Sequence, residues 1–249
     1  MEKVYGGKRN QAFPVNKEIN TISIIIVTRN ADQDLQNCLD SITNQRYKNL
    51  EVLVFDGAST DGTLNIIRKN EEHISYWQSE PDKGIYDAMN KAIKHATGDW
   101  VYFLGADDLL LDSFSDIIES LQRKNTIYYG GCITDKGYKL DGEFSSYRLT
   151  KMNICHHAVF YPLAVFKKYS YQIQFRVYAD YVLNIQCWGD SDFPKKYIPI
   201  IIAKFNSNGF SATTSDELFE NKKNALIKKY LSRFVNFRVA MKKWKQKNK

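Results

Sequence analysis

The sequence runs Gly98-Asp99-Trp100-Val101-Tyr102-Phe103-Leu104-Gly105-Ala106-Asp107-Asp108 near its middle. These residues read as a turn, a short apolar strand and then two adjacent carboxylates. Four large apolar residues in succession are typical of a strand that is buried on both faces. In open α/β sheets ligands bind at the carboxyl ends of the strands, so Asp107 and Asp108 stand where a ligand would bind. Neighbouring carboxylates repel each other, and a divalent cation would relieve that repulsion. The alternative is an acidic loop that caps the next helix.

The residues on the N-terminal side of this stretch predict further strands that alternate with helices. We expect strands at 21–28, 50–55 and 74–78, and helices at 32–44, 63–70 and 85–97. This alternation indicates an α/β fold with a mostly parallel central sheet flanked by helices. Polar residues follow three of the strands, at 28–30, 56–61 and 107–108. The sequence therefore predicts one site at the shared carboxyl edge of the sheet.

The second half of the chain is less regular. Residues 127–134 are expected to form an edge strand, and residues 135–146 are rich in turns. The other expected elements are strands at 155–161 and 197–205 and helices at 114–121, 163–169 and 179–188. Residues 1–20 read as an irregular leader because Gly6-Gly7 and Pro14 interrupt them.

Composition favours a globular protein that stays in the cytoplasm. The 249 residues are 43% hydrophobic and 25% charged, as is usual for a globular chain. Aliphatic runs such as residues 24–27 are far shorter than the ~20 residues that cross a bilayer. Residues 1–14 lack the apolar centre of an export signal. The four cysteines are widely spaced, which is typical of reduced thiols.

The positive charge is concentrated at the C-terminus. Residues 221–249 contain 11 Lys and Arg and no acid, and removing these from the total of +7 leaves −4 for residues 1–220. The tail predicts a basic amphipathic helix whose apolar side carries Ile227, Tyr230, Leu231, Phe234, Met241 and Trp244. Such a helix suits an anionic membrane surface. Alternatively, it packs its apolar face on the domain. The acidic body argues against nucleic-acid binding.

Three loops at the predicted strand ends suit a phosphate compound. Asp56 can accept hydrogen bonds from a base or a ribose. Ser59, Thr60 and Gly62 lie where a loop enters a helix, and free N–H groups and the helix dipole favour anions there. Lys83 precedes another helix and can reach a phosphate, although a solvated loop lysine fits equally. The dinucleotide fingerprint, the phosphate loop and the zinc-protease motif are absent. This leaves a nucleotide-type site with Mg²⁺ or Mn²⁺ on strand-end carboxylates.

The ordered motifs of the chain resemble the family 2 glycosyltransferases. The resemblance rests on residues 23–30, 56–63, 98–99 and 104–108 and covers roughly residues 20–210. The run Glu80-Pro81-Asp82-Lys83-Gly84-Ile85-Tyr86-Asp87-Ala88-Met89-Asn90 is similar to a subgroup that builds bacterial surface polysaccharides, colanic-acid-type enzymes included. The resemblance implies the GT-A fold, a nucleotide-sugar donor, a divalent cation and inversion at the anomeric carbon.

The resemblance also implies roles for single residues. Asp107 matches the last acid of the family's D-x-D metal motif, with Asp108 beside it as support, and both are expected at the metal. Gly105 stands where many members have the first Asp. Gly57 replaces the second Asp of the commoner D-D-G-S form, a variation that the subgroup shares. The expected donor site consists of Thr28, Arg29, Asn30, Asp56, Ser59, Lys83, Asp87, Asn90, Ala106 and Asp107, with Asp56 on the base, usually uracil.

On the acceptor side, Asp180 matches the acid of the family's E-D-like motif, which implies a general base. The alternative is an N-cap for the helix that it precedes. His156 matches a histidine that precedes a family Phe segment, and a structural histidine fits equally. His157 is expected to be structural. The expected acceptor or site-closing residues are His156, Tyr181, Asn208 and Gly209.

We therefore expect an inverting glycosyltransferase that uses Mn²⁺ or Mg²⁺ and moves a sugar, from UDP in the first instance, to a lipid-linked or oligosaccharide acceptor. Residues 21–215 would form the GT-A domain, with a donor half (21–110) and an acceptor half (111–215). Residues 216–249 would form the basic tail, in peripheral contact with the anionic inner membrane. The alternatives are a nucleotidyltransferase of related topology and a non-catalytic nucleotide-sugar-binding protein.

Overall fold

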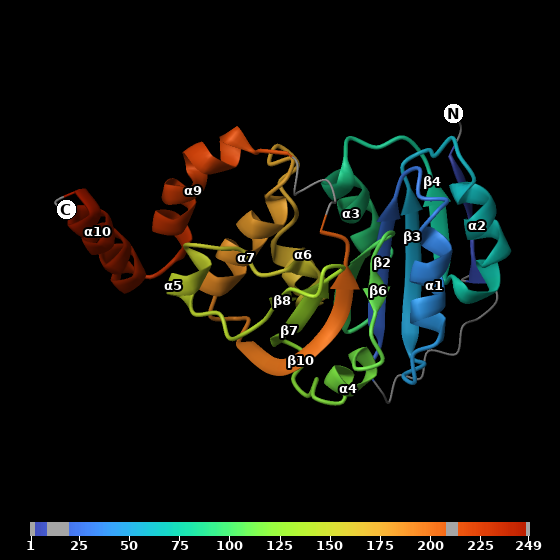
Figure 1. Cartoon of the computed structure of the whole chain (residues 1–249), viewed down its shortest axis with the longest axis horizontal. Coiled ribbons are helices and arrows are strands. Elements are labelled where there is room, and N and C mark those ends of the chain that lie inside the picture. The colour runs from blue at the N-terminus through green and yellow to red at the C-terminus, as the bar shows by residue number, and fades with distance from the viewer. Residues whose placement is uncertain (1–2, 9–19, 208–213, 248–249) are drawn as a thin grey trace.

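Strand β5 (Trp100–Gly105), the apolar strand of the central motif, lies inside a ten-stranded sheet (Figure 1). The computed structural model describes residues 3–8, 20–207 and 214–247. The strand order is β1-β4-β3-β2-β5-β9-β7-β10-β6, and β8 pairs with β7. The other strands are β1 (Val4–Gly6), β2 (Ile22–Thr28), β3 (Leu50–Asp56), β4 (Tyr76–Ser79), β6 (Leu109–Leu110), β7 (Ile127–Thr134), β8 (Lys139–Leu140), β9 (Val159–Pro162) and β10 (Lys195–Phe205).

Helices cover both faces of this sheet. In the first half they are α1 (Leu35–Thr43), α2 (Thr63–Lys69), α3 (Ile85–Ile93), α4 (Phe114–Ile118) and the 3₁₀ turn η2 (Glu71–His73). In the second half they are α5 (Ser146–Leu149), η3 (His156–Ala158), α6 (Val165–Lys168), α7 (Ala179–Gly189), α9 (Glu217–Tyr230) and α10 (Arg233–Lys247).

The first half forms the parallel part of the sheet. Neighbouring strands in the order β4-β3-β2-β5 are parallel to one another. β9 then runs antiparallel to both β5 and β7, and β7 is parallel to β10. The predicted α/β fold with a mostly parallel central sheet flanked by helices is confirmed.

The central strands are buried on both faces because their side chains alternate between two cores. On β2, Ile22, Ile24 and Ile26 pack against α1, α2 and α4, whereas Ile25 and Val27 face the core that contains α3 and α7. β5 alternates in the same way. This burial explains why the strands read as continuous apolar runs.

Three expectations about the strands are corrected by the structure. Residues 4–6 of the expected leader form β1, which pairs antiparallel with β4. β7 is not an edge strand, because it lies between β9 and β10. The expected strand at 155–161 begins as the 3₁₀ turn η3, and only residues 159–162 form β9.

The C-terminal region forms two helices, α9 and α10, in place of the single amphipathic helix that the sequence predicted. Asp216 caps α9 by accepting from the N–H of Phe219, and it also accepts from the N–H of Val177 before α7. Ile227 and Leu231 are buried in the core. The helix stops at Leu231, whose backbone is extended, so the helix that follows takes a different direction.

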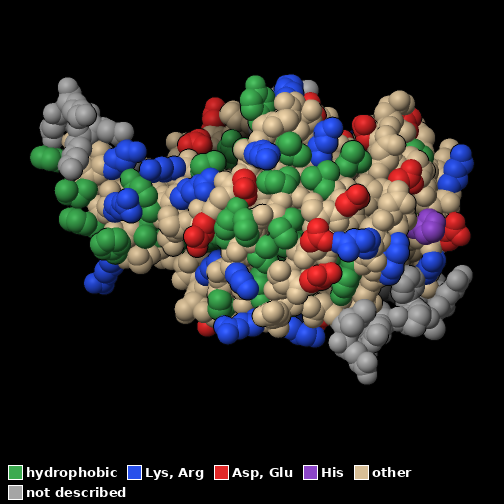
Figure 2. Space-filling view, turned by 60° about the horizontal axis from the view of Figure 1, so that its bottom comes forward, with side chains coloured by type: hydrophobic (Ala, Val, Ile, Leu, Met, Phe, Trp, Pro, Cys, Tyr) green, Lys and Arg blue, Asp and Glu red, His purple; other side chains and the backbone are tan. Residues whose placement is uncertain are grey.

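α10 presents a second apolar stripe away from the core. Val235 is buried against the domain, whereas Phe234, Phe237 and Trp244 are 74%, 64% and 62% exposed. Figure 2 shows hydrophobic and basic side chains together at this end of the molecule. No helix in the described part of the chain combines the length and the apolar character that a bilayer span requires.

Candidate active site

The strand register brings the predicted polar residues to one edge of the sheet. Thr28 pairs with Asp56 across β2 and β3, and Val27 pairs with Gly105 across β2 and β5. The residues that follow these strands therefore lie at the same carboxyl edge, as the sequence predicted.

Asp56 organises the loop between β3 and α2. It is 3% exposed, and its carboxylate accepts hydrogen bonds from the hydroxyl and the N–H of Ser59. Ser79 at the end of β4 donates its hydroxyl to the same carboxylate at 2.5 Å. These donors fix the orientation of Asp56, so the loop that it holds is ordered before any ligand binds.

Asn30 connects this loop to the end of β2. Its φ of 53° lies in the left-handed region, which asparagine adopts more readily than most residues. Its N–H donates to Oγ of Ser59 at 2.7 Å, and its Oδ1 accepts from the N–H of Thr60 at 2.9 Å. Arg29 beside it is exposed. Thr28 Oγ1 is buried and has no hydrogen-bond partner among the described residues, a costly arrangement that a bound ligand would relieve.

Asp107 and Asp108 have different environments. Asp107 is exposed, and partial desolvation together with the charge of Asp108 raises its pKa. Asp108 is buried and accepts from Nε2 of His157 at 2.6 Å, the N–H of Asn206 at 3.0 Å and the N–H of Gly105 at 3.1 Å. Burial alone would raise the pKa of Asp108, but charged His157 holds it below its usual range. Asp108 is thus engaged by the protein, and Asp107 is open to a ligand.

The approach of Asp108 explains the glycine at position 105. A Cβ on Gly105 would lie 2.2 Å from Oδ2 of Asp108 and 3.0 Å from Oδ1 of Asp107. No side chain fits there while Asp108 keeps this position. An acid at position 105 and the observed position of the Asp108 carboxylate therefore exclude each other. Gly57 is comparable, because a Cβ there would lie 2.5 Å from Oδ2 of Asp82.

Two adjacent histidines connect the carboxylates of the two halves. The rings of His156 and His157 are in contact, with centroids 3.7 Å apart and planes tilted by 39°. Burial would lower the pKa of His157, but Asp108 raises it well above the ordinary value. Burial and the charge of His157 lower the pKa of His156 to about 3, so it is neutral. Nδ1 of His156 lies 3.9 Å from Oδ2 of Asp180.

Asp180 lies in the first turn of α7 and is nearly buried. Its Oδ1 accepts from the N–H of Tyr181 at 2.8 Å and lies 3.0 Å from the hydroxyl of Tyr86 on α3. Its Oδ2 accepts from Nδ2 of Asn153 at 2.7 Å. Burial raises the pKa of Asp180 to about 6 despite these donors. No side-chain cap of α7 is formed, which argues against the N-cap alternative.

Two of the residues predicted around α3, Asp87 and Asn90, have hydrogen-bond or ion-pair partners within the protein. Asp87 accepts from the N–H of Lys83 at 3.0 Å and pairs with Lys91. Asn90 donates to the carbonyl of Tyr171 at 2.8 Å and accepts from its N–H at 3.0 Å. These contacts give Asp87 and Asn90 structural partners, whereas Lys83 is exposed.

The remaining predicted residues lie deeper or outside the described chain. Ala106 is buried in the core, so only its backbone can face a donor. Tyr181 is also buried, and its hydroxyl donates to the carbonyl of Leu149, which places it in the core and corrects its expected contact with an acceptor. Asn208 and Gly209 lie outside the residues that the structure describes.

The carboxyl edge fits a divalent cation that is shared with a phosphate ligand. No three His, Cys, Asp or Glu of the described residues gather into a cluster that could hold a metal. Mg²⁺ and Mn²⁺ in phosphate sites take one or two carboxylates and complete their shells with phosphate oxygens and water. The exposed Asp107 beside buried Asp108 supplies such a ligand. Partial desolvation first, and then the charge of Asp108, raise the pKa of Asp107, and a cation would relieve the repulsion between the two carboxylates.

Several residues of this site carried no signal in the sequence. No motif contains Ser79 or Asn153, and none indicates that His157 pairs with Asp108. Tyr86 lies inside the run 80–90, but that run gave no sign of its contact with Asp180. His157 lies beside the predicted His156, which is the one local hint.

Comparison with known proteins gives a family match and curated relatives for this chain. The model of the family described as "Glycosyl transferase family 2" matches residues 23–181. The chain is 35% identical over 208 residues to a PGL/p-HBAD biosynthesis glycosyltransferase of Mycobacterium bovis, with 79% of this chain and 81% of the relative covered.

Solved structures share the fold. S. aureus TarS 1–349 in complex with UDP has a TM-score of 0.62 at 17% identity and covers 86% of this chain and 71% of its own. The mannosyltransferase PcManGT of Pyrobaculum calidifontis, in complex with GDP-Man and Mn²⁺, has a TM-score of 0.58 at 18% identity and covers 79% and 61%. Against S. aureus TarS the chain spans 39% of that protein's length. The fold is of the GT-A type, and the chain belongs to glycosyl transferase family 2.

Proposed function

We propose that this glycosyltransferase moves a sugar, with inversion, from a nucleoside diphosphate sugar to a hydroxyl of a lipid-linked saccharide during assembly of a bacterial surface polysaccharide. The observation that carries the proposal is the His156–His157 pair, which contacts Asp180 on one side and Asp108 on the other. The two histidines thus place Asp108, at the edge proposed to bind a cation, near the nearly buried carboxylate of Asp180. Structural neighbours in complex with UDP, UDP-GlcNAc and GDP-Man support the donor class.

The donor would lie at the carboxyl edge of β2, β3 and β5. Thr28 offers an unpaired buried hydroxyl, and Arg29 and Lys83 offer exposed cations for phosphate. Asp56, held by Ser59 and Ser79, stands where a base is expected, and UDP is the first candidate. Asp107 would hold Mn²⁺ or Mg²⁺, with Asp108 as its support. A cation held there would supply positive charge for the leaving diphosphate.

Asp180 would act as the general base. The acceptor hydroxyl has a high pKa, so its proton must leave as the oxygen attacks the anomeric carbon. The C–O bond to the diphosphate breaks in the same step, and the proton passes to the Asp180 carboxylate. Attack from the face opposite the diphosphate inverts the anomeric configuration. With a pKa of about 6, Asp180 is ionised near neutral pH and is a stronger base than an ordinary aspartate.

Membership of the glycosyltransferase family argues against the two alternatives considered from the sequence, a nucleotidyltransferase and a non-catalytic binding protein. A nucleotidyltransferase would release pyrophosphate or transfer a nucleotide. A non-catalytic binding protein would have no need for the carboxylate of Asp180, which is oriented by three donors from separate segments.

The donor site is tested by calorimetry of UDP and GDP with and without Mn²⁺. We expect UDP to bind more tightly with Mn²⁺, and Asp107→Asn to remove that dependence. Asp112→Asn, an exposed acid a few residues further along the chain, is the matched control and should behave as the native protein. An Asp107→Asn protein whose UDP affinity still responds to Mn²⁺ would refute the assignment.

The base is tested by Asp180→Asn. We expect UDP and Mn²⁺ to bind as in the native protein while sugar transfer and UDP release fall by about 10²–10⁴-fold, the usual contribution of a general base. Retention of native turnover would show that another group accepts the proton.

A membrane-bound acceptor is consistent with the surface of α10. Phe234, Phe237, Met241 and Trp244 recur every three or four residues, so they form one exposed stripe, and the helix contains no acid. An interfacial helix combines such a stripe with flanking cations. Peripheral contact with the inner membrane would bring the site to a lipid-linked acceptor.

Vesicle flotation tests this contact in the full-length chain. We expect the protein to float with phosphatidylglycerol vesicles and to stay unbound with phosphatidylcholine. Phe237→Ser with Trp244→Ser should abolish flotation, and Tyr138→Ser, an exposed aromatic elsewhere, should not. Deletion of residues 221–249 is unsuitable because it would remove Ile227 and Leu231 from the core. Equal flotation of the double variant would contradict the proposal.

A further inference from the structure

A chain of amide side chains ends on the carboxylate of Asp180. The hydroxyl of Tyr161 on β9 donates to Oδ1 of Asn184 at 2.7 Å. Nδ2 of Asn184 donates to Oδ1 of Asn153 at 2.9 Å. Nδ2 of Asn153 then donates to Oδ2 of Asp180 at 2.7 Å. We propose that Asn153 is a positioning residue for the reaction, and that it fixes which oxygen of Asp180 receives the acceptor proton. This inference rests on the proposed function of Asp180.

The direction of the chain is set by the carboxylate on which it ends. An ionised carboxylate only accepts hydrogen bonds, so Asn153 must present Nδ2 to Asp180. Oδ1 of Asn153 then faces Asn184 and accepts from its Nδ2. Oδ1 of Asn184 is left to accept from the hydroxyl of Tyr161. Tyr161 and Asn184 are fully buried, so neither can exchange these partners for water.

The hydrogen-bonded side chains leave the two oxygens of Asp180 in different environments. Oδ1 already receives the N–H of Tyr181 and lies against the hydroxyl of Tyr86. Oδ2 receives one donor, Asn153, and faces His156 at 3.9 Å. A carboxylate oxygen accepts two hydrogen bonds, so Oδ2 keeps one position for an acceptor hydroxyl. Without Asn153 the carboxylate could rotate and lose this arrangement.

Asn153 also stabilises the ionised form of Asp180, because its N–H bonds only the charged carboxylate oxygen with full strength. The other titratable groups around Asp180 are four tyrosines and two histidines: Tyr86 on α3, Tyr161 on β9, Tyr171 before α7, Tyr181 on α7, and His156 and His157 on η3. The tyrosines have raised pKa values and stay neutral, and His156 is neutral with a pKa of about 3. His157 is held charged by Asp108. Asp180 is therefore the group that titrates near pH 6.

The test is the pH profile of kcat for UDP release in Asn153→Asp. This change keeps the shape of the side chain and the bond from Asn184, but it replaces the donor toward Asp180 with a second carboxylate. We expect the acid limb to move to higher pH by about one unit or more, because two carboxylates then share the position. Asn153→Ser should give a smaller shift in the same direction. Asn125→Asp, an exposed amide remote from Asp180, adds the same charge and should leave the limb unchanged.

Two controls separate the possible outcomes. UDP and Mn²⁺ affinity should remain native in each Asn153 variant, because the chain does not reach the donor edge. In an Asp180→Asn background, Asn153→Ser should reduce turnover no further. If Asp180→Asn turns over normally, the proposed function fails. If Asp180→Asn is inactive but Asn153→Asp and Asn153→Ser keep the native limb and kcat, only the positioning role is overturned. If Asn153→Asp does not fold, Asn153→Ser alone decides by the same criterion.

Discussion

Nε2 of His157 lies 2.6 Å from Oδ2 of Asp108, and the two side chains form an ion pair that is almost closed to solvent. The pair joins the turn after β5 to the 3₁₀ turn η3. His156, the preceding residue, faces Asp180. The dipeptide His156–His157 therefore lies between the carboxylates proposed to hold the cation and the proposed base. The contact between His157 and Asp108 thus connects the turn that carries Asp107 to the segment that faces Asp180.

Removing one partner of this pair should destabilise the fold. In His157→Ala the charge of Asp108 would stay buried with only backbone donors, and breaking a buried pair costs about 3 kcal/mol or more. We expect a loss of about 3 kcal/mol in the free energy of unfolding, measured by urea titration. His73→Ala, whose ring is half exposed beside Glu72, should cost little. Equal losses in the two variants would mean that the pair adds nothing to the fold.

The same pair should make stability depend on pH in two ranges. The pKa of His157 is raised in the folded protein, so its contribution is complete below the ordinary histidine value of about 6.5 and is lost as pH rises through the folded value. The pKa of Asp108 is lowered, so its contribution is complete above about 3.9 and is lost as pH falls through the folded value.

The free-energy difference between native protein and His157→Gln should therefore be largest between about pH 4 and 6.5 and smaller on either side. Urea titrations at about pH 3, 5.5 and 9 measure it. A difference that does not change with pH would show that the pair is not ionised.

Gly105→Ala should weaken metal-assisted donor binding. The added Cβ would meet Oδ2 of Asp108 at 2.2 Å, so that carboxylate must move and disturb Asp107 with it. We expect Mn²⁺-dependent UDP affinity to fall at least about tenfold, or about 1.4 kcal/mol. Gly137→Ala, in the turn between β7 and β8 where an added Cβ would meet nothing within 4 Å, is the control for UDP affinity. Native UDP affinity in Gly105→Ala would mean that the carboxylates can shift without consequence.

The sequence predicted the parts of the fold that depend on local patterns. Strands such as β3 and β5 are buried, so they appear as apolar runs; Asp56 is the last residue of β3, and Asp107 lies two residues after the end of β5. The order of β9, β7 and β10 could not be predicted, because antiparallel insertion of β9 depends on contacts between distant segments. The break at Leu231 was also missed, since helical spacing continues through it.

The site was predictable to the same extent. Carboxylates at strand ends are visible in the sequence, whereas the groups that orient them are single polar residues in apolar surroundings. Asn153 and Tyr86 reach Asp180 from sites 27 and 94 residues away along the chain. The resemblance suggested a donor contact for Asn90, but the fold gives its amide to the backbone of Tyr171.

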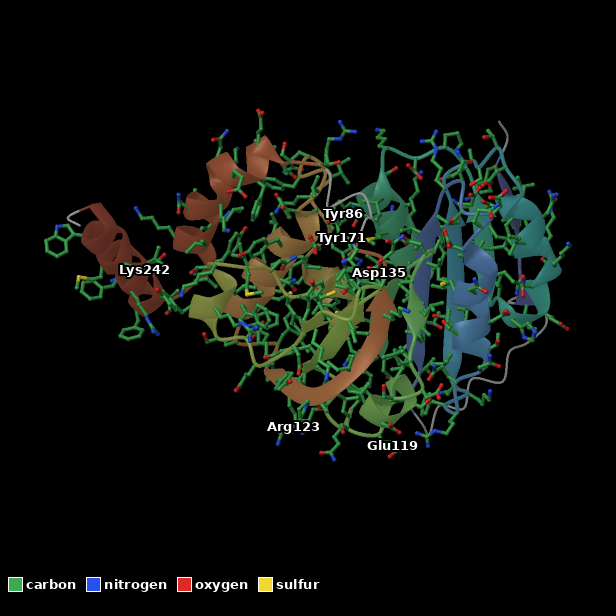
Figure 3. The ribbon with its side chains drawn as sticks, in the orientation of Figure 1. Tyr86, Glu119, Arg123, Asp135, Tyr171 and Lys242 are labelled. Carbon is green, nitrogen blue, oxygen red and sulfur yellow. The ribbon has the colours of Figure 1, made fainter. Side chains whose placement is uncertain are left out.

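Asn90→Ala distinguishes these two roles of Asn90. Tyr86 and Tyr171 lie side by side, 5.2 Å apart between ring centroids (Figure 3), and the amide of Asn90 holds the backbone of Tyr171 in place. Its loss leaves two backbone groups without these bonds, at about 1 kcal/mol each. We expect a loss of about 2 kcal/mol in unfolding free energy with native UDP affinity. Asn125→Ala, an exposed amide with one long contact, should change neither quantity. A native stability with weakened UDP binding would instead restore the donor contact, because only a ligand contact lowers affinity without loosening the fold.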